Sequence, residues 1–156
     1  MRLTLSTHKY SRSIRISRKK GLRLHNEDLV NLSKARIEHA NDCLKESEIL
    51  LSAGEYKGAA NRAYYAAFHS MRAVLILDEF DSKKHSGIIA KFREFYLKTD
   101  FFDKEFSDSI SSLFRVRTAS DYDDFYVVSK SDALAQFEKA KKILRLIENH
   151  LAEKWN

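Results

Sequence analysis

The stretch RVRTASDYDDFY at residues 115–126 combines groups that can bind a phosphate with groups that can move a proton. Arg117 and Asp121 are four residues apart and share a face if the preceding helix continues this far, and Tyr122 lies on the face of Arg115. Acidic side chains at the C-terminal end of a helix oppose the helix dipole. The acids at 121, 123 and 124 therefore need cations or a ligand nearby.

A second polar set lies on a helix that is otherwise made of alanine and large apolar residues. At 100° per residue, one arc of about 100° holds five polar side chains: Asn61, Arg62, Tyr65, His69 and Arg72. Because a buried, unpaired cation is costly, this stripe must face a cleft, a partner subunit or buried acids. In the simpler interpretation, carboxylates of neighbouring helices pair with the arginines, and His69 is a hydrogen-bonded core histidine.

The two polar sets would satisfy each other if their helices packed side by side. We therefore expect Arg117, Asp121, Tyr122, Arg62 and His69 to converge on one cleft, with the arginines of the stripe near the acids.

A third candidate is the basic segment KKHSG at residues 83–87. Lys83, Lys84 and His85 come directly before the expected start of a helix. Free backbone N–H groups and positive side chains together favour an anion there. The alternative is an ordinary solvated basic loop.

The elements that must position these residues are helices. The chain has no proline and only four glycines among its 156 residues, which is typical of an all-α protein. Apolar residues at steps of three and four predict five helices: 26–53, 56–77, 86–98, 104–119 and 130–152. Ser129 and Asp132 form a capping-box pattern before the last. Short loops indicate an antiparallel up-and-down bundle of four to five helices over residues 26–156.

The N-terminal residues 1–25 form a basic arm that precedes this domain. They contain eight lysines and arginines and no acid, so that residues 26–156 carry a net charge of −2 within the total of +6. Such an arm can bind nucleic acid phosphates by releasing counterions. The alternative is a solvated tail without a ligand.

The sequence offers no sign of a membrane span, a signal peptide, a cofactor or a metal site. Cys43 is the only cysteine. We expect no Cys or His near it at metal-ligand spacing, and we interpret it as an inert packing residue. No apolar run reaches the length of a bilayer. We expect a cytoplasmic protein.

Three stretches together resemble a known family: NRAYYAAFHSMRA (61–73), KKHSG (83–87) and LFRVRTASDY (113–122). They resemble HEPN-domain proteins, in particular a small prokaryotic branch with the signatures RAYYA-x-FH, K-x-HSG and L-[YF]-x-x-R-x-x-x-DY. The resemblance covers about residues 28–152 and leaves the basic arm outside. It implies a helical bundle that forms a homodimer, with a polar cleft around the family arginine, here Arg117.

The resemblance also implies a function and a partner. Many HEPN proteins are metal-independent ribonucleases and toxins, encoded beside a minimal nucleotidyltransferase that neutralises them, sometimes by adenylylating a tyrosine. A histidine four to six residues after the arginine moves the proton of a 2′-hydroxyl, and the arginine stabilises the phosphate charge. This implies catalytic roles for Arg117, Asp121 and Tyr122, and cleft or ligand-binding roles for a second group: Arg62, Tyr65, His69, Arg72, Lys83 and His85.

The chain departs from this family pattern at the histidine. The residues after Arg117 are Thr, Ala, Ser, Asp, Tyr, Asp and Asp. Two functions therefore stay open. One is an RNA-directed toxin–antitoxin component with endoribonuclease activity. The other is a non-catalytic HEPN module that binds a nucleotide or a nucleotidyltransferase partner.

Overall fold

The computed structural model describes residues 25–99 and 102–156, and the basic arm lies outside them up to residue 24. Five α-helices make up the described part: α2 (Asn26–Ser52), α3 (Tyr56–Leu75), α4 (His85–Phe92), α5 (Lys104–Tyr122) and α6 (Lys130–Lys154). A 3-10 turn at Ile76–Asp78 extends α3, and a π-helical turn at Arg93–Leu97 extends α4. No strand occurs in these ranges, so the predicted all-α class is confirmed.

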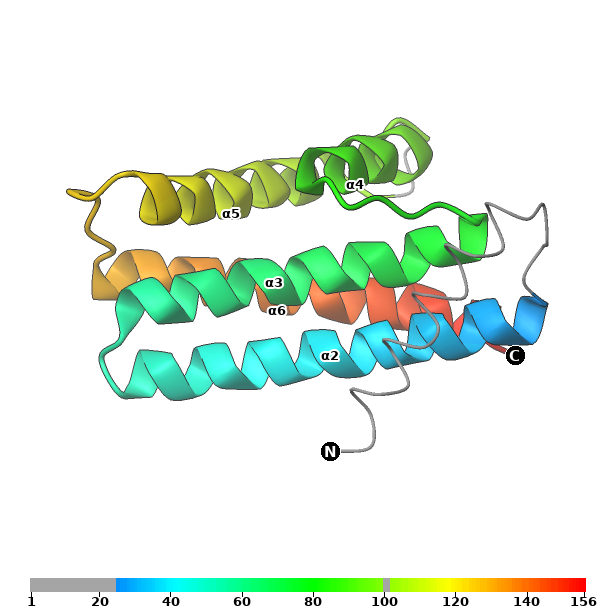
Figure 1. Cartoon of the computed structure of the whole chain (residues 1–156), viewed down its shortest axis with the longest axis horizontal. Helices are drawn as coiled ribbons and strands as arrows, with labels where there is room; N and C mark the ends of the chain where they lie inside the picture. The colour runs from blue at the N-terminus through cyan, green and yellow to red at the C-terminus, as the bar shows by residue number, and fades with distance from the viewer. Residues whose placement is uncertain (1–24, 100–101) are drawn as a thin grey trace.

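The four long helices, α2, α3, α5 and α6, alternate in direction along the chain and form an antiparallel bundle (Figure 1). The shorter α4 packs against α3, and its last residue, Phe92, contacts Phe106 of α5. α3 is the central helix, since it packs against α2, α4, α5 and α6. None of the helices within the described ranges is long and apolar enough to span a bilayer.

The sequence of α3 explains its central place. Small alanines allow neighbouring helices to approach closely, and the larger side chains Tyr64, Phe68 and Met71 are buried between them. More than half of the residues of α3 are buried, as expected for a helix that is apolar on most sides. The polar stripe of the sequence therefore lies between closely packed neighbours.

The ends of the helices differ from the prediction in two places. α5 continues to Tyr122, three residues past the predicted end at 119, and the Arg117–Asp121 ion pair spans this added turn. The predicted helix 86–98 begins at His85 and changes to π-helical hydrogen bonding at Arg93. The capping box of Ser129 and Asp132 at the start of α6 is confirmed.

Candidate functional site

Arg117 lies on the face of α5 that meets α3. Its Nε is 2.8 Å from Oδ2 of Asp121, and its Nη2 donates a hydrogen bond to the Tyr65 hydroxyl at 3.4 Å. The guanidinium also lies over the rings of Tyr64 and Tyr65, at 5.7 and 5.9 Å from their centroids. The contact with Asp121 lacks hydrogen-bond geometry at Nε. The arginine is therefore held in place by rings and charge, and its directional donors are only weakly engaged.

His85 reaches the same tyrosines from the first residue of α4. Its Nδ1 is 2.8 Å from the Tyr64 hydroxyl, and its ring stacks on Phe68 at 4.2 Å. Burial, followed by the positive charges of Arg117 and Arg72, lowers the pKa of His85 below its ordinary value, against a smaller opposing effect of Asp121. The imidazole is therefore neutral at pH 7 and able to accept a proton. We call Arg117, Asp121, Tyr64, Tyr65 and His85 the Arg117 cluster.

Tyr64 connects Arg117 and the neutral His85 within this cluster. Burial raises its pKa above that of an ordinary tyrosine, so its hydroxyl stays protonated. Two tautomers of His85 fit the 2.8 Å contact, since Tyr64 can donate to Nδ1 or accept from Nδ1–H. In the second, the lone pair of His85 is on Nε2, which is the form that a general base requires.

Hydrogen bonds in the loop before α4 hold His85 at the start of that helix. The backbone N–H of Ser82 donates to Asp81 Oδ1 at 3.0 Å, and the Ser82 hydroxyl accepts from the N–H of Lys84 at 3.1 Å. A Cβ on Gly87 would lie 2.8 Å from that hydroxyl oxygen, so glycine allows the first turn of α4 to pack against the loop. Lys83 is exposed beside it.

Arg62 lies at the edge of the Arg117 cluster. Its guanidinium is 4.9 Å from the centroid of Tyr65, the ring that Arg117 also contacts. It pairs with Glu46 of α2 at 3.3 Å, where both side chains are substantially exposed. This pair is weak, and Arg62 can contribute to a charged ligand bound at Tyr65.

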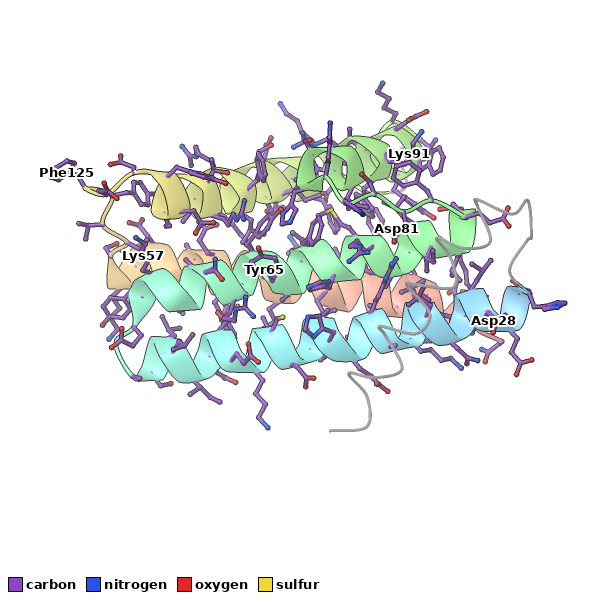
Figure 2. All side chains as sticks on the ribbon, viewed as in Figure 1. Asp28, Lys57, Tyr65, Asp81, Lys91 and Phe125 are labelled. Carbon is purple, nitrogen blue, oxygen red and sulfur yellow. The ribbon has the colours of Figure 1, made fainter. Side chains whose placement is uncertain are left out.

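Arg72 does not pair with the acids of α5, so the prediction of that pairing is wrong. It donates to both carboxylate oxygens of Asp81, at 2.9 and 3.0 Å, and Arg36 of α2 donates to the same carboxylate at 2.7 Å. Arg36 is buried, and burial together with Arg72 lowers its pKa to about 10. This network joins α2, α3 and the loop before α4, so Arg72 has a structural role. Figure 2 labels Asp81, the carboxylate that both arginines share.

His69 lies on the other side of Tyr65, toward α2. Its ring is 5.9 Å from Tyr65 and 4.3 Å from His39, measured between centroids. Burial and the nearby His39, Arg72, Arg36 and Arg62 lower the pKa of His69 to about 2. His69 therefore meets the Arg117 cluster through the Tyr65 ring and does not pair with Arg117 itself.

Tyr122 and the acids that follow it do not join the cluster either. Tyr122 is 78% exposed, and Phe125 in the next loop is 93% exposed and points away from the bundle (Figure 2). Asp123 accepts a hydrogen bond from the N–H of Phe125 and so shapes the loop. Of the five residues expected to converge, Arg117 and Asp121 pair directly, Arg62 and His69 meet them only through Tyr65, and Tyr122 lies apart in solvent.

Two features of the site were missed in the sequence. Tyr64 is a buried core residue, but its hydroxyl also reaches His85, because YY in the 61–73 motif places two hydroxyls on adjacent faces of α3. The expectation that Cys43 has no His at metal-ligand spacing is wrong, because His39 precedes it by four residues on the same helix. A pocket on another part of the bundle, lined by Arg93, Leu97, Phe102 and Phe106 among others, includes none of the predicted site residues.

The comparisons with known proteins agree with the fold and motifs. Residues 33–150 match the model of the HEPN domain. The chain is 31% identical to "Putative toxin MJ0142" of Methanocaldococcus jannaschii, covering 76% of this chain and 80% of the relative. It is 30% identical to a UPF0332 protein of Thermotoga maritima, and the match covers 70% of this chain and 83% of that relative.

A solved structure shows the same fold. The crystal structure of TT1696 from Thermus thermophilus aligns with a TM-score of 0.66 and 18% identity, covering 75% of this chain and 96% of TT1696. The match to the domain model covers most of the chain and spans all three motifs around the Arg117 cluster. The chain therefore belongs to the HEPN family.

Proposed function

We propose that the protein is the HEPN component of a prokaryotic toxin–antitoxin-type system and cleaves RNA without a metal ion at the Arg117 cluster. The observation that carries this proposal is the meeting of Arg117 and a neutral His85 on the same pair of tyrosines. The relatives named as toxins support a toxin-like role.

In this proposal His85 takes the place of the histidine that is absent after Arg117. It accepts the proton of a ribose 2′-hydroxyl through Nε2 while Nδ1–H donates to Tyr64. The 2′-oxygen then attacks the adjacent phosphorus to form a 2′,3′-cyclic phosphate, the P–O5′ bond breaks, and the 5′-oxygen of the next nucleotide takes a proton from water. General base catalysis of this kind contributes about 10²–10⁴-fold.

Arg117 stabilises the charge that grows on the phosphate oxygens. Its guanidinium is partly exposed and weakly hydrogen-bonded, so a phosphate can replace the Tyr65 hydroxyl as its partner. Asp121 keeps the guanidinium oriented, and Arg62 adds positive charge on the far side of Tyr65. The basic arm would supply further phosphate contacts along the RNA.

Tyr122 has a separate role in this proposal, at the surface presented to a partner. Its hydroxyl is freely accessible on the last turn of α5, five residues after Arg117. A minimal nucleotidyltransferase would neutralise the toxin by adenylylating Tyr122, which places a negatively charged group close to the RNA-binding arginine. A homodimer would present two such sites.

The second candidate is a non-catalytic HEPN module that binds a nucleotide or a nucleotidyltransferase. It is favoured by the absence of histidine from residues 118–124. In that case Arg117 and Arg62 hold a phosphate and no bond is cleaved.

Cleavage of total RNA in the presence of a chelator separates the two candidates. We expect wild type to cleave and Arg117→Ala to lose more than about 10²-fold in rate, the usual cost of removing a charge-stabilising donor. Arg115→Ala is the matched control, since Arg115 is exposed on the same helix two residues away. Equal rates for wild type and Arg117→Ala would refute the nuclease site, and no cleavage by any variant would favour the binding module.

A further inference from the structure

Three side chains with metal-binding atoms meet between α2 and α3, on the side of Tyr65 away from Arg117. They are His39 and Cys43 of α2 and His69 of α3, and one ligand atom from each lies within 4.8 Å of the others. The Cys43 Sγ is 4.0 Å from Nε2 of His39, and the rings of His39 and His69 are 4.3 Å apart. His39 and Cys43 share one face of α2 because they are four residues apart.

These distances are close to those of a bound transition metal. Zn–S bonds of about 2.3 Å and Zn–N bonds of about 2.0–2.1 Å place S and N ligands about 3.6 Å apart in a tetrahedron. Separations of up to 4.8 Å close to these values if a pair of ligand atoms approach each other by up to about 1.4 Å, which side-chain rotations can provide. The cluster therefore approaches a three-ligand site with one coordination position open.

The ligand types select the class of metal. Two imidazoles and one thiolate suit soft or borderline ions and offer no oxygen for Mg²⁺, Ca²⁺ or Mn²⁺. His69 would bind the metal as a neutral imidazole, the form that a ligand must have. Cys43 is fully buried, and a bound metal would have to displace the proton of its thiol.

The surrounding charges limit the metal further. Arg36, Arg62 and Arg72 are near enough to act on His69, and they repel any cation placed there. Glu46 and Asp42 act on Cys43 with the opposite sign. The thiolate is therefore needed to offset the arginines, which excludes hard ions that bind thiolates weakly.

We propose that His39, Cys43 and His69 form a site for a thiophilic d¹⁰ ion, Zn²⁺ or Cu⁺, that ties α2 to α3. The ion enters past His39, which is exposed, whereas Cys43 is fully buried. Its effect is structural: it fixes the His69 ring on which Tyr65 stacks, and it takes no part in RNA cleavage. The site does not depend on the proposed nuclease activity.

The full chain, stripped of metal with a chelator and dialysed, is titrated with Co²⁺ as a spectroscopic substitute for Zn²⁺, and with Cu⁺ against a chromogenic competitor. We expect one equivalent of at least one ion to bind, with thiolate-to-metal charge-transfer absorption and a rise in melting temperature. His39→Ala and Cys43→Ser should each weaken binding by more than about 100-fold, beyond the usual cost of losing an outer-shell partner. Replacing the exposed His39 leaves the core packed, so this variant stays folded.

His25→Gln is the matched control, because His25 is exposed and lies outside the cluster. It should bind as wild type does. The proposal is overturned if neither ion binds with a thiolate signature, or if Cys43→Ser binds as tightly as wild type. Which of the two ions binds more tightly identifies the metal, and circular dichroism verifies the fold of each variant.

Discussion

Arg117 and His85 come from different helices and are joined through Tyr64 and Tyr65 rather than through each other. A histidine close in sequence to the arginine is therefore not required to place an imidazole beside it. The KKHSG motif was interpreted in the sequence as a place for an anion, and the structure shows that its histidine is part of the Arg117 cluster. Distance along the chain alone could not reveal this, because the loop before α4 returns along α3 and brings the start of α4 back to the middle of that helix (Figure 1).

The sequence indicated that Arg72 needs an acidic partner but not which residue that partner is. The polar stripe on a buried helix indicated that carboxylates must lie near its arginines, and Asp81 is such a carboxylate beside Arg72. The sequence could not say which acids supply them, since Asp81 is nine residues away and its partner Arg36 is on another helix. Pairing between distant helices depends on packing that helical periodicity does not encode.

His69 predicts a pH dependence of stability. Its pKa is about 2 in the folded protein and its ordinary value is 6.5, so the unfolded chain takes up a proton as the pH falls below 6.5 and the folded protein does not. Stability is therefore complete above pH 6.5 and is lost as the pH falls. Between pH 6.5 and 5 we expect a loss of up to about 2 kcal/mol from this residue.

Urea unfolding with chelator at several pH values measures this loss. His69→Gln should have a flatter profile than wild type, with the remaining slope due partly to His85 and His150, whose pKa values are also lowered. His25→Gln should follow wild type. A slope unchanged by His69→Gln would show that this imidazole is protonated in the folded protein.

At the scale of elements, helix positions followed from the sequence because apolar residues repeat every three to four positions and caps are local. The capping box at Ser129 depends on residues three apart and could be identified directly. The π-helical turn at Arg93–Leu97 could not, since it arises where α4 passes into the loop before α5. Helix ends depend on tertiary contacts more than helix centres do.

The Arg36–Asp81–Arg72 network predicts a strong effect of one carboxylate on the packing of α2 with α3. Asp81→Asn keeps the shape of the side chain but leaves two arginines facing each other, one of them only 5% exposed. We expect a loss of about 3 kcal/mol in the free energy of unfolding. Denaturant unfolding of the variant and of wild type gives this value.

Glu105→Gln serves as the control for this measurement. This variant breaks the ion pair between Glu105 and Lys142. The Glu105 side chain is 70% exposed and the Lys142 side chain is 56% exposed. Such an exposed pair contributes little to the free energy of unfolding, so the denaturant midpoint of this variant should equal that of wild type. If Asp81→Asn were as mild as Glu105→Gln, the network would not hold the helices together.

For the whole molecule, the charge distribution predicts that folding and the proposed RNA binding depend on different parts of the chain. The described bundle contains the core clusters, and the eight cations of residues 1–25 lie in a segment almost entirely outside the described residues. Deleting residues 1–25 should leave helicity and melting temperature nearly unchanged. It should also flatten the dependence of RNA affinity on salt, because fewer counterions are released.

Circular dichroism and RNA binding at several salt concentrations measure the two effects on the same preparation. Loss of the fold on deletion would give the arm a structural role. Light scattering on both forms also tests the proposed homodimer, which should persist without the arm. A monomer at micromolar concentration would contradict the dimer.

The central claim is that His85, and not His69, serves the Arg117 cluster as the base in RNA cleavage. The most direct measurement is the single-turnover rate of RNA cleavage by His85→Gln and His69→Gln, with chelator present and folding verified by circular dichroism. We predict that His85→Gln loses about 10²–10⁴-fold in rate, as expected for loss of a general base, while His69→Gln stays within a few fold of wild type. A His85→Gln variant that cleaves as fast as wild type would contradict the account.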